Sequence, residues 1–252
     1  MKKSIGEITE IYKQADVERL PAFINEFESD ERNGVQNLIK KAKKRLSDLE
    51  KEKERMYEMF SHERKYGEYQ YICGVDEVGC GPLAGPVVSA AVILPKNCDI
   101  LYLNDSKKLS ENKREEIFDE IMEKAVSVGI GFATPERIDE INIRQADFEA
   151  MRMALSKLSV EPDFIMVDGY PIGGIDKKQI SIVKGDAKSA SIAAASIIAK
   201  VTRDRLMTEY DTVFPGYGFA SNKGYGSAEH IQAIKELGPT PIHRKSFIKN
   251  FI

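Results

Sequence analysis

The sequence is poor in cysteine, in long apolar runs and in net positive charge. Its three cysteines, Cys73, Cys80 and Cys98, form no CxxC pair. This argues against a zinc site or a disulfide framework and favours a reducing compartment, so we expect a cytoplasmic protein. No apolar run approaches the roughly 18 to 20 residues that span a bilayer, and we expect no membrane association. The N-terminal residues carry charge but no apolar h-region, so they do not resemble a secretory signal.

A basic surplus is also missing, because the formal net charge of the 252 residues is -3. This value argues against a protein that binds DNA through general positive charge, although a basic patch can exist within a neutral total. Acidic residues gathered around a metal ion would also lower the net charge. The composition therefore permits a nucleic-acid substrate without predicting one.

Residues 1–69 are expected to form a helical extension. Between Gly34 and Gly67 apolar residues recur at three- and four-residue steps, which predicts one amphipathic helix. Two shorter helical patterns precede it, at 5–15 and 18–28, and Pro21 suits the first turn of the second. Acids and bases alternate over 40–55, which favours a solvated helix face over a nucleic-acid clamp.

Residues 70–252 are expected to form a second, α/β domain. Short apolar segments at 71–75, 87–94, 126–133, 164–167 and 180–183 predict strands. Helical patterns are found at 135–158, 187–210 and 229–237, and the second of these is rich in Ala and Ser, which lets a helix lie close to a sheet. Strands followed by alternating strands and helices predict a mixed sheet flanked by helices.

Acidic residues stand where predicted strands meet loops. Asp76 and Glu77 follow the first strand, Asp168 follows another, and Asp186 precedes the Ala/Ser-rich helix. Each also has a structural interpretation: an exposed turn at Asp76–Glu77, a turn at Asp168 and a helix N-cap at Asp186. Carboxylates that converge at a sheet edge would repel one another unless cations neutralise them, and oxygen ligands favour Mg²⁺ or Mn²⁺. The spacing alone does not show that they converge.

A glycine- and proline-rich loop follows the first pair of acids. Gly79-Cys80-Gly81 has the form of a dinucleotide-binding fingerprint, but that motif requires a helix directly after the glycines. Here Pro82 and Pro86 intervene and a strand-like segment follows. The alternative is a tight loop whose backbone N–H and C=O groups contact a substrate.

The loop and several later motifs together resemble the bacterial ribonuclease HII family. The segment DEVGCGPLAGPV resembles the family signature DEVGRGPLAGPV, and roughly residues 70–248 are covered. Further matches occur in order: LNDSKKLS (103–110), DEINI (139–143), MVDGY (166–170), KGDAKSASIAAASIIAKVTRD (184–204), NKGYG (222–226) and HRKSF (243–247). The extension resembles that of longer Gram-positive-type members.

The resemblance implies a ribonuclease H-like fold and assigns catalysis to Asp76, Glu77, Asp168 and Asp186. It implies that these four acids bind two divalent ions, Mg²⁺ or Mn²⁺, which activate the attacking water and stabilise the leaving 3′ oxygen. The expected reaction is hydrolysis 5′ of ribonucleotides in RNA/DNA hybrids and of single ribonucleotides in duplex DNA. It leaves 5′-phosphate and 3′-hydroxyl ends and serves ribonucleotide excision repair and primer removal. We expect a monomer.

The resemblance also assigns substrate binding to the loop Gly79-Cys80-Gly81, which reads the ribose 2′-hydroxyl largely through backbone groups. Cys80 departs from the family, which has arginine there; we expect 2′-hydroxyl recognition to survive and affinity to fall. Tyr225 matches the tyrosine that stacks on the deoxyribose past the ribonucleotide, and otherwise would anchor a loop. Lysines near the motifs are candidate phosphate ligands or solvated surface residues: Lys107, Lys184, Lys188 and Lys223. His230 and His243 are interpreted as structural.

Three other functions compete with this hypothesis. Ribonuclease HIII shares the fold but acts weakly on single embedded ribonucleotides; the tyrosine of NKGYG and the helical N-terminus favour HII. A non-catalytic hybrid-binding module is disfavoured by the complete set of acids. A phosphate-handling metabolic enzyme is disfavoured because no helix follows the glycine loop.

Overall fold

The computed structural model describes residues 3–252, and the chain divides into two compact units, Met1–Tyr57 and Glu58–Ile252. Within the described residues no helix has both the length and the apolar character that crossing a bilayer requires. The first unit is helical, as predicted. Its elements are α1 (Ile5–Gln14), η1 (Val17–Arg19), α2 (Leu20–Phe27) and most of α3 (Asn33–Met59).

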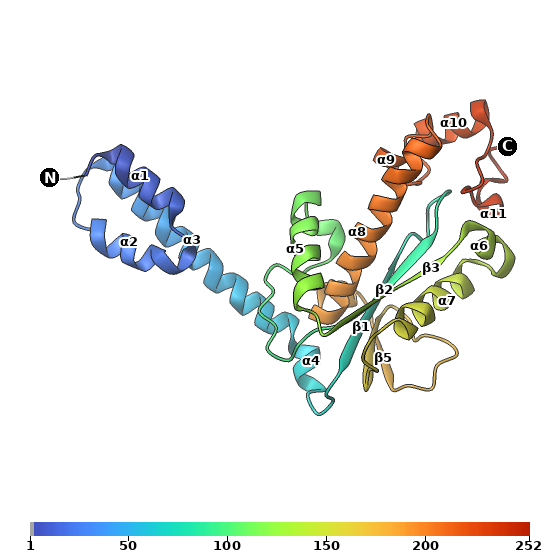
Figure 1. Cartoon of the computed structure of the whole chain (residues 1–252), viewed down its shortest axis with the longest axis horizontal. Helices are drawn as coiled ribbons and strands as arrows, with labels where there is room; N and C mark the ends of the chain where they lie inside the picture. The colour runs from blue at the N-terminus through green and yellow to red at the C-terminus, as the bar shows by residue number, and fades with distance from the viewer. Residues whose placement is uncertain (1–2) are drawn as a thin grey trace. The chain divides into compact units, whose positions relative to one another are not determined.

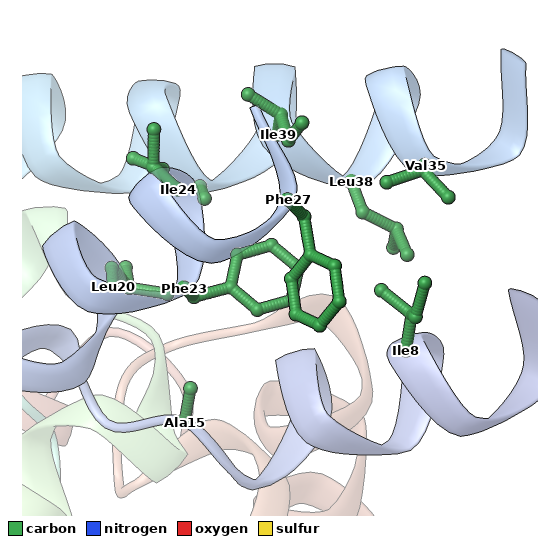
Figure 2. Packing of buried hydrophobic residues seen from close by; sticks show 10 residues of the cluster. Ile8, Ala15, Leu20, Phe23, Ile24, Phe27, Val35, Leu38 and Ile39 are labelled. Atoms are coloured by element: carbon green, nitrogen blue, oxygen red, sulfur yellow. The ribbon is translucent and has the colours of Figure 1, made fainter. Parts of the chain in front are cut away.

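The helices of the first unit enclose their own apolar core (Figure 2). Phe23 and Phe27 of α2 pack with tilted rings whose centroids are 5.1 Å apart, and Val35 and Ile39 of α3 belong to the same buried cluster. Ser4 and Glu7 form a capping box at the start of α1, which satisfies two backbone N–H groups. Most charged residues of α3 between 40 and 55 are exposed, as the predicted solvated helix face requires.

The second unit is built on one mixed five-stranded sheet of order β3-β2-β1-β4-β5 (Figure 1). The strands are β1 (Ile72–Val78), β2 (Val87–Ile93), β3 (Ser127–Ala133), β4 (Phe164–Asp168) and β5 (Gln179–Ile182). β1, β2 and β3 are antiparallel neighbours, whereas β4 and β5 run parallel to β1. The predicted strands and the hairpin that joins β1 to β2 are confirmed.

The second unit also contains several helices. They are α4 (Ser61–Lys65), α5 (Glu111–Lys124), α6 (Pro135–Ile141), α7 (Ile143–Ser156), α8 (Ala190–Val213), α9 (Phe219–Asn222), α10 (Ala228–Leu237) and α11 (Lys245–Ile248). Two further short 3-10 turns are η2 (Ser106–Lys108) and η3 (Gly185–Ala187). α5 was not expected, because Ile117 and Ile121 are its only buried residues. The segment predicted as one helix over 135–158 is two, because Asn142 adopts φ 70° and caps α7.

α8 and α7 pack on opposite faces of the sheet (Figure 1). On the α8 face, a Cβ added at Gly74 of β1 would lie 2.1 Å from the backbone carbon of Ser191, so only glycine allows this approach. On the α7 face, Cys73 and Val75 join Met151 and Ala154 in a buried cluster. Side chains of β1 therefore alternate between the two layers, as the period of two requires.

Candidate active site

Asp76 and Glu77 lie within β1 rather than after it, where β1 still pairs with β2. Because they are neighbours in a strand, their side chains leave opposite faces of the sheet. Asp76 is buried beside Ser196 of α8, and its Oδ1 accepts a hydrogen bond from the Glu77 N–H at 2.8 Å. Glu77 is half-buried on the α7 face, opposite Ser89 of β2. The exposed-turn interpretation of this pair is wrong.

A hydrogen bond joins Asp168 to Gly185, the residue directly before Asp186. Asp168 is the last residue of β4, and its Oδ1 accepts a hydrogen bond from the Gly185 N–H at 2.6 Å. Asp186 follows in η3 and is half-buried. It does not cap α8, because that helix begins at Ala190 and its N-cap is Ser189. The helix-cap interpretation of Asp186 is therefore wrong.

The four acids come from three segments that are distant in the chain, and their charges change one another's pKa values. Burial raises the pKa of Asp76 well above its usual range, and the charges of Glu77 and Asp168 raise it further. Burial raises the pKa of Glu77, and the charges of Asp168 and Asp186 raise it further. Burial, then Asp105 and Asp168, raise the pKa of Asp186. The parallel pairing of β1 with β4 brings Asp168 to the same edge of the sheet as Asp76 and Glu77, and the charge of Asp186 acts on Glu77 there.

This carboxylate cluster fits divalent cations. Carboxylates that raise each other's pKa are held together against repulsion, and a bound cation would relieve it. Lys107 of η2 is the cation that lowers the pKa of both Glu77 and Asp186. The atoms that the four acids offer to a metal ion are carboxylate oxygens, which suit hard ions such as Mg²⁺ and Mn²⁺.

The glycine loop is fixed by a buried arginine. Arg244 has no exposed surface, and its guanidinium donates to the carbonyls of Gly79 at 2.5 Å, Cys80 at 3.1 Å and Gly85 at 2.8 and 3.0 Å. Gly79 adopts φ 93°, a region that favours glycine. Arg244 therefore fixes the backbone of the loop through its carbonyl groups.

Tyr225 lies next to this loop with its ring accessible. A Cβ built on Gly81 would be 3.9 Å from Tyr225 Cε1, and the tyrosine is 43% exposed. A second buried arginine, Arg203 of α8, donates to the carbonyls of Pro86, Lys223 and Ala84 at 2.8–3.0 Å. It thereby ties the glycine loop to the segment that carries Tyr225.

His230 and His243 are buried and support the same segment. Their Nε2 atoms are 3.0 Å apart, His230 Nδ1 is 2.8 Å from the Tyr225 carbonyl oxygen, and the Thr240 N–H donates to His243 Nδ1 at 2.9 Å. These partners assign the ring protons to His230 Nδ1 and His243 Nε2. Burial lowers both pKa values, that of His243 to about 4 with help from His230. The structural interpretation of both histidines is confirmed.

The other predicted lysines differ in their surroundings. Lys184 is exposed with φ 57°, directly before η3. The Lys188 ammonium donates to the Val183 carbonyl at 2.7 Å, and that of Lys223 donates to Thr208 Oγ1 at 2.9 Å. Of the four predicted lysines, Lys107 acts on the charge of Glu77 and Asp186. Lys184, Lys188 and Lys223 lie on other segments.

Sequence reasoning missed several residues of this site. Asp147 of α7 lies beside Glu77 and Cys80, with ligand atoms of the three within 4.8 Å of one another. Glu63 of α4 accepts hydrogen bonds from Ser189 Oγ at 2.6 Å and the Ser191 N–H at 2.9 Å, which fixes the start of α8. Arg203 and Arg244 stand within the motifs KVTRD and HRKSF, which was the one available signal. Asp147 and Glu63 lie in ordinary helical patterns.

The fold and the acidic edge together define a ribonuclease H-like class. The chain resembles the crystal structure of ribonuclease H2 from Pyrococcus horikoshii OT3 with a TM-score of 0.62 and 28% identity, over 72% of this chain and 96% of that one. It has the same fold as Bst-RNase HIII, solved in complex with Mn²⁺, with a TM-score of 0.53 and 20% identity over 73% and 65% of the two chains. The expected ribonuclease H-like fold is confirmed.

Within this class the sequence match is more specific. The family model for ribonuclease HII matches residues 73–250, and the model for the ribonuclease HII N-terminal domain matches residues 4–67. A ribonuclease HII from Lachnoclostridium phytofermentans is 60% identical over 247 residues, 97% of each chain. The chain belongs to the ribonuclease HII family. It is accordingly a hydrolase of the metal-dependent ribonuclease H type.

Proposed function

We propose that the chain hydrolyses the phosphodiester bond 5′ of ribonucleotides, both in RNA/DNA hybrids and at single ribonucleotides embedded in duplex DNA. The observation that carries this proposal is the position of the four acids at the sheet edge, beside a rigid backbone loop and an accessible tyrosine. This arrangement would put the metal-binding acids, the loop that contacts the ribose and the stacking tyrosine on one surface. Ribonucleotide excision from DNA and removal of RNA primers are the cellular roles that this specificity serves.

Asp76, Glu77, Asp168 and Asp186 would hold two divalent ions, Mg²⁺ or Mn²⁺. Such ions, when bound, supply Lewis acidity to the attacking water and the leaving oxygen of an in-line displacement. The chain's own contribution is to hold the carboxylates in place: the Glu77 N–H orients Asp76, and the Gly185 N–H orients Asp168. The products would carry 5′-phosphate and 3′-hydroxyl ends.

Substrate recognition is assigned to the glycine loop and Tyr225. The loop at Gly79-Cys80-Gly81 would contact the ribose 2′-hydroxyl through its backbone, whose position depends on Arg244 rather than on the side chain at 80. Tyr225 would stack on the next sugar, where a second 2′-hydroxyl would crowd the ring. Lys107, Lys184, Lys188 and Lys223 are candidate phosphate ligands around this surface.

The test is cleavage of two duplexes, one with a single ribonucleotide in DNA and one with a long RNA/DNA hybrid, in Mg²⁺ and in chelator. We expect a cut 5′ of the single ribonucleotide, and no cut in chelator. Asp76→Asn should slow the reaction by at least about 10³-fold, roughly 4 kcal/mol of barrier, because a metal ligand loses its charge. Asp119→Asn, an exposed residue of α5, is the matched control and should keep the native rate.

Three results would contradict the proposal. Cleavage of the long hybrid alone would point to ribonuclease HIII-like specificity. Binding without cleavage in Mg²⁺ and in Mn²⁺ would point to a hybrid-binding module. A native rate in Asp76→Asn, with an unchanged circular dichroism spectrum, would remove the acids from the mechanism.

A further inference from the structure

A thiol and two carboxylates converge on the α7 side of the sheet, next to the acidic edge. The Cys80 Sγ lies 3.9 Å from Glu77 Oε1, and one carboxylate oxygen of Asp147 completes a group whose ligand atoms all lie within 4.8 Å of one another. Tetrahedral zinc with one sulfur and two oxygen ligands needs separations of about 3.3–3.5 Å, from Zn–S near 2.3 Å and Zn–O near 2.0 Å. Small side-chain rotations would therefore bring the three atoms onto one ion.

Two buried polar atoms beside this group have unused hydrogen-bonding capacity. Ser89 is fully buried on β2, directly opposite Glu77. Among the described residues neither Ser89 Oγ nor Asp147 Oδ1 has a hydrogen-bond partner of acceptable geometry. Buried polar atoms without partners are rare in native proteins and point to an absent ion or water.

The surroundings favour a cation over a second hydrogen-bond network. Asp147 and Glu77 each offer a carboxylate oxygen to a group whose ligand atoms lie within 4.8 Å of one another, so two acidic groups oppose each other across the space. Apolar side chains pack around Cys80, among them Val87, Ile138 and Ala150, which limits its contact with water. A bound cation would offset both the repulsion and the desolvation of the charged ligands.

We propose that Glu77, Cys80 and Asp147 form a second divalent-cation site, specific for thiophilic ions such as Zn²⁺. Sulfur ligation selects zinc-like ions over Mg²⁺, whereas the four-acid cluster offers oxygen alone. Ion binding would release the thiol proton to solvent as the thiolate forms. The absence of a CxxC pair, which argued against a zinc site, applies to cysteine-rich structural sites and not to this mixed one.

Occupation of this site would inhibit cleavage, because Glu77 would be drawn toward Cys80 and away from the other acids. This consequence rests on the proposed function, whereas ion binding itself does not. The two are separated by measuring binding through a sulfur-specific signal and inhibition through cleavage.

The binding experiment titrates Co²⁺ into the full chain and follows the near-ultraviolet absorption that only sulfur-to-cobalt charge transfer produces. We expect a band that saturates at one ion per chain, resists excess Mg²⁺ and disappears on adding Zn²⁺. Cys80→Ala and Cys80→Ser should abolish the band, Asp147→Asn should weaken Co²⁺ binding at least about tenfold, and Cys98→Ala should preserve it. Circular dichroism establishes that each variant is folded.

No band in the native chain, or a band that persists in both Cys80 variants, would overturn the proposal. In the cleavage assay Zn²⁺ should inhibit the native chain in Mg²⁺, and inhibition of Asp147→Asn should need at least about tenfold more Zn²⁺. Equal inhibition of the two would refute the regulatory consequence, even if the band is present. A chain that shows the band but cleaves nothing would refute the proposed function and leave the ion site standing.

Discussion

Replacement of Arg244 by lysine tests whether a buried guanidinium holds the glycine loop. The side chain makes four hydrogen bonds to three carbonyl groups, those of Gly79, Cys80 and Gly85. A lysine ammonium is a single point of charge and cannot reproduce this planar fork. At least one or two carbonyls would lose their partner, each at about 1–3 kcal/mol.

We therefore expect Arg244→Lys to lower the free energy of unfolding by about 2–4 kcal/mol. For a chain of this size that corresponds to a fall in the melting midpoint of roughly 5–15 °C. Thermal unfolding followed by circular dichroism measures it. Arg205→Lys is the matched control, because Arg205 is half-exposed and pairs with Glu115, where the change should stay within about 0.5 kcal/mol. If Arg244→Lys lowers the free energy of unfolding by no more than the Arg205→Lys control, the account of the loop is refuted.

Three further changes test other parts of the structure. Unfolding free energy should fall as the pH drops from about 6.5 to about 4, by about 2–4 kcal/mol, because buried His243 has a lowered pKa and unfolding exposes a group that then takes up a proton. Urea unfolding of the native chain and of His243→Gln at several pH values should show a steeper slope in the native chain, since buried His230 still contributes in the variant. Gly74→Ala should cost at least about 3 kcal/mol, since its Cβ would overlap the Ser191 backbone of α8; an unchanged melting midpoint would contradict the close packing. Cys80→Arg should tighten binding and leave the preference for RNA over DNA within about threefold of native, because the loop backbone contacts the sugar. Competition binding with matched duplexes measures both quantities. A large change in the preference for RNA would contradict this prediction.

Much of the fold could be predicted from local pattern, because its strands are short apolar runs bounded by turn residues. The strand at 126–133 differs from β3 by a single residue, and Gly238 ends α10 as expected. The break between α6 and α7 was missed, since the positive φ of Asn142 leaves no trace in hydrophobic periodicity. α5 was missed because only one narrow stripe of it is buried.

The candidate site needed more than pattern. Asp168 and Asp186 are brought to Asp76 by the parallel pairing of β4 with β1 and by the turn after β5, and spacing along the chain records neither. Resemblance to a family supplied that link. The contribution of Asp147 depends on how the face of α7 is oriented over the sheet, and so only the folded structure reveals it.

The most direct test of the account is the single-turnover rate of Asp168→Asn on a DNA duplex with one embedded ribonucleotide, in saturating Mg²⁺. Burial is the largest cause of the raised pKa values of Asp76, Glu77 and Asp186, and the charge of Asp168 adds to it at all three. Asp168→Asn removes one carboxylate ligand from this cluster, so it should weaken metal binding. We predict a rate at least about 10³-fold below native with the melting midpoint retained. A variant that cuts 5′ of the ribonucleotide at the native rate would contradict the account.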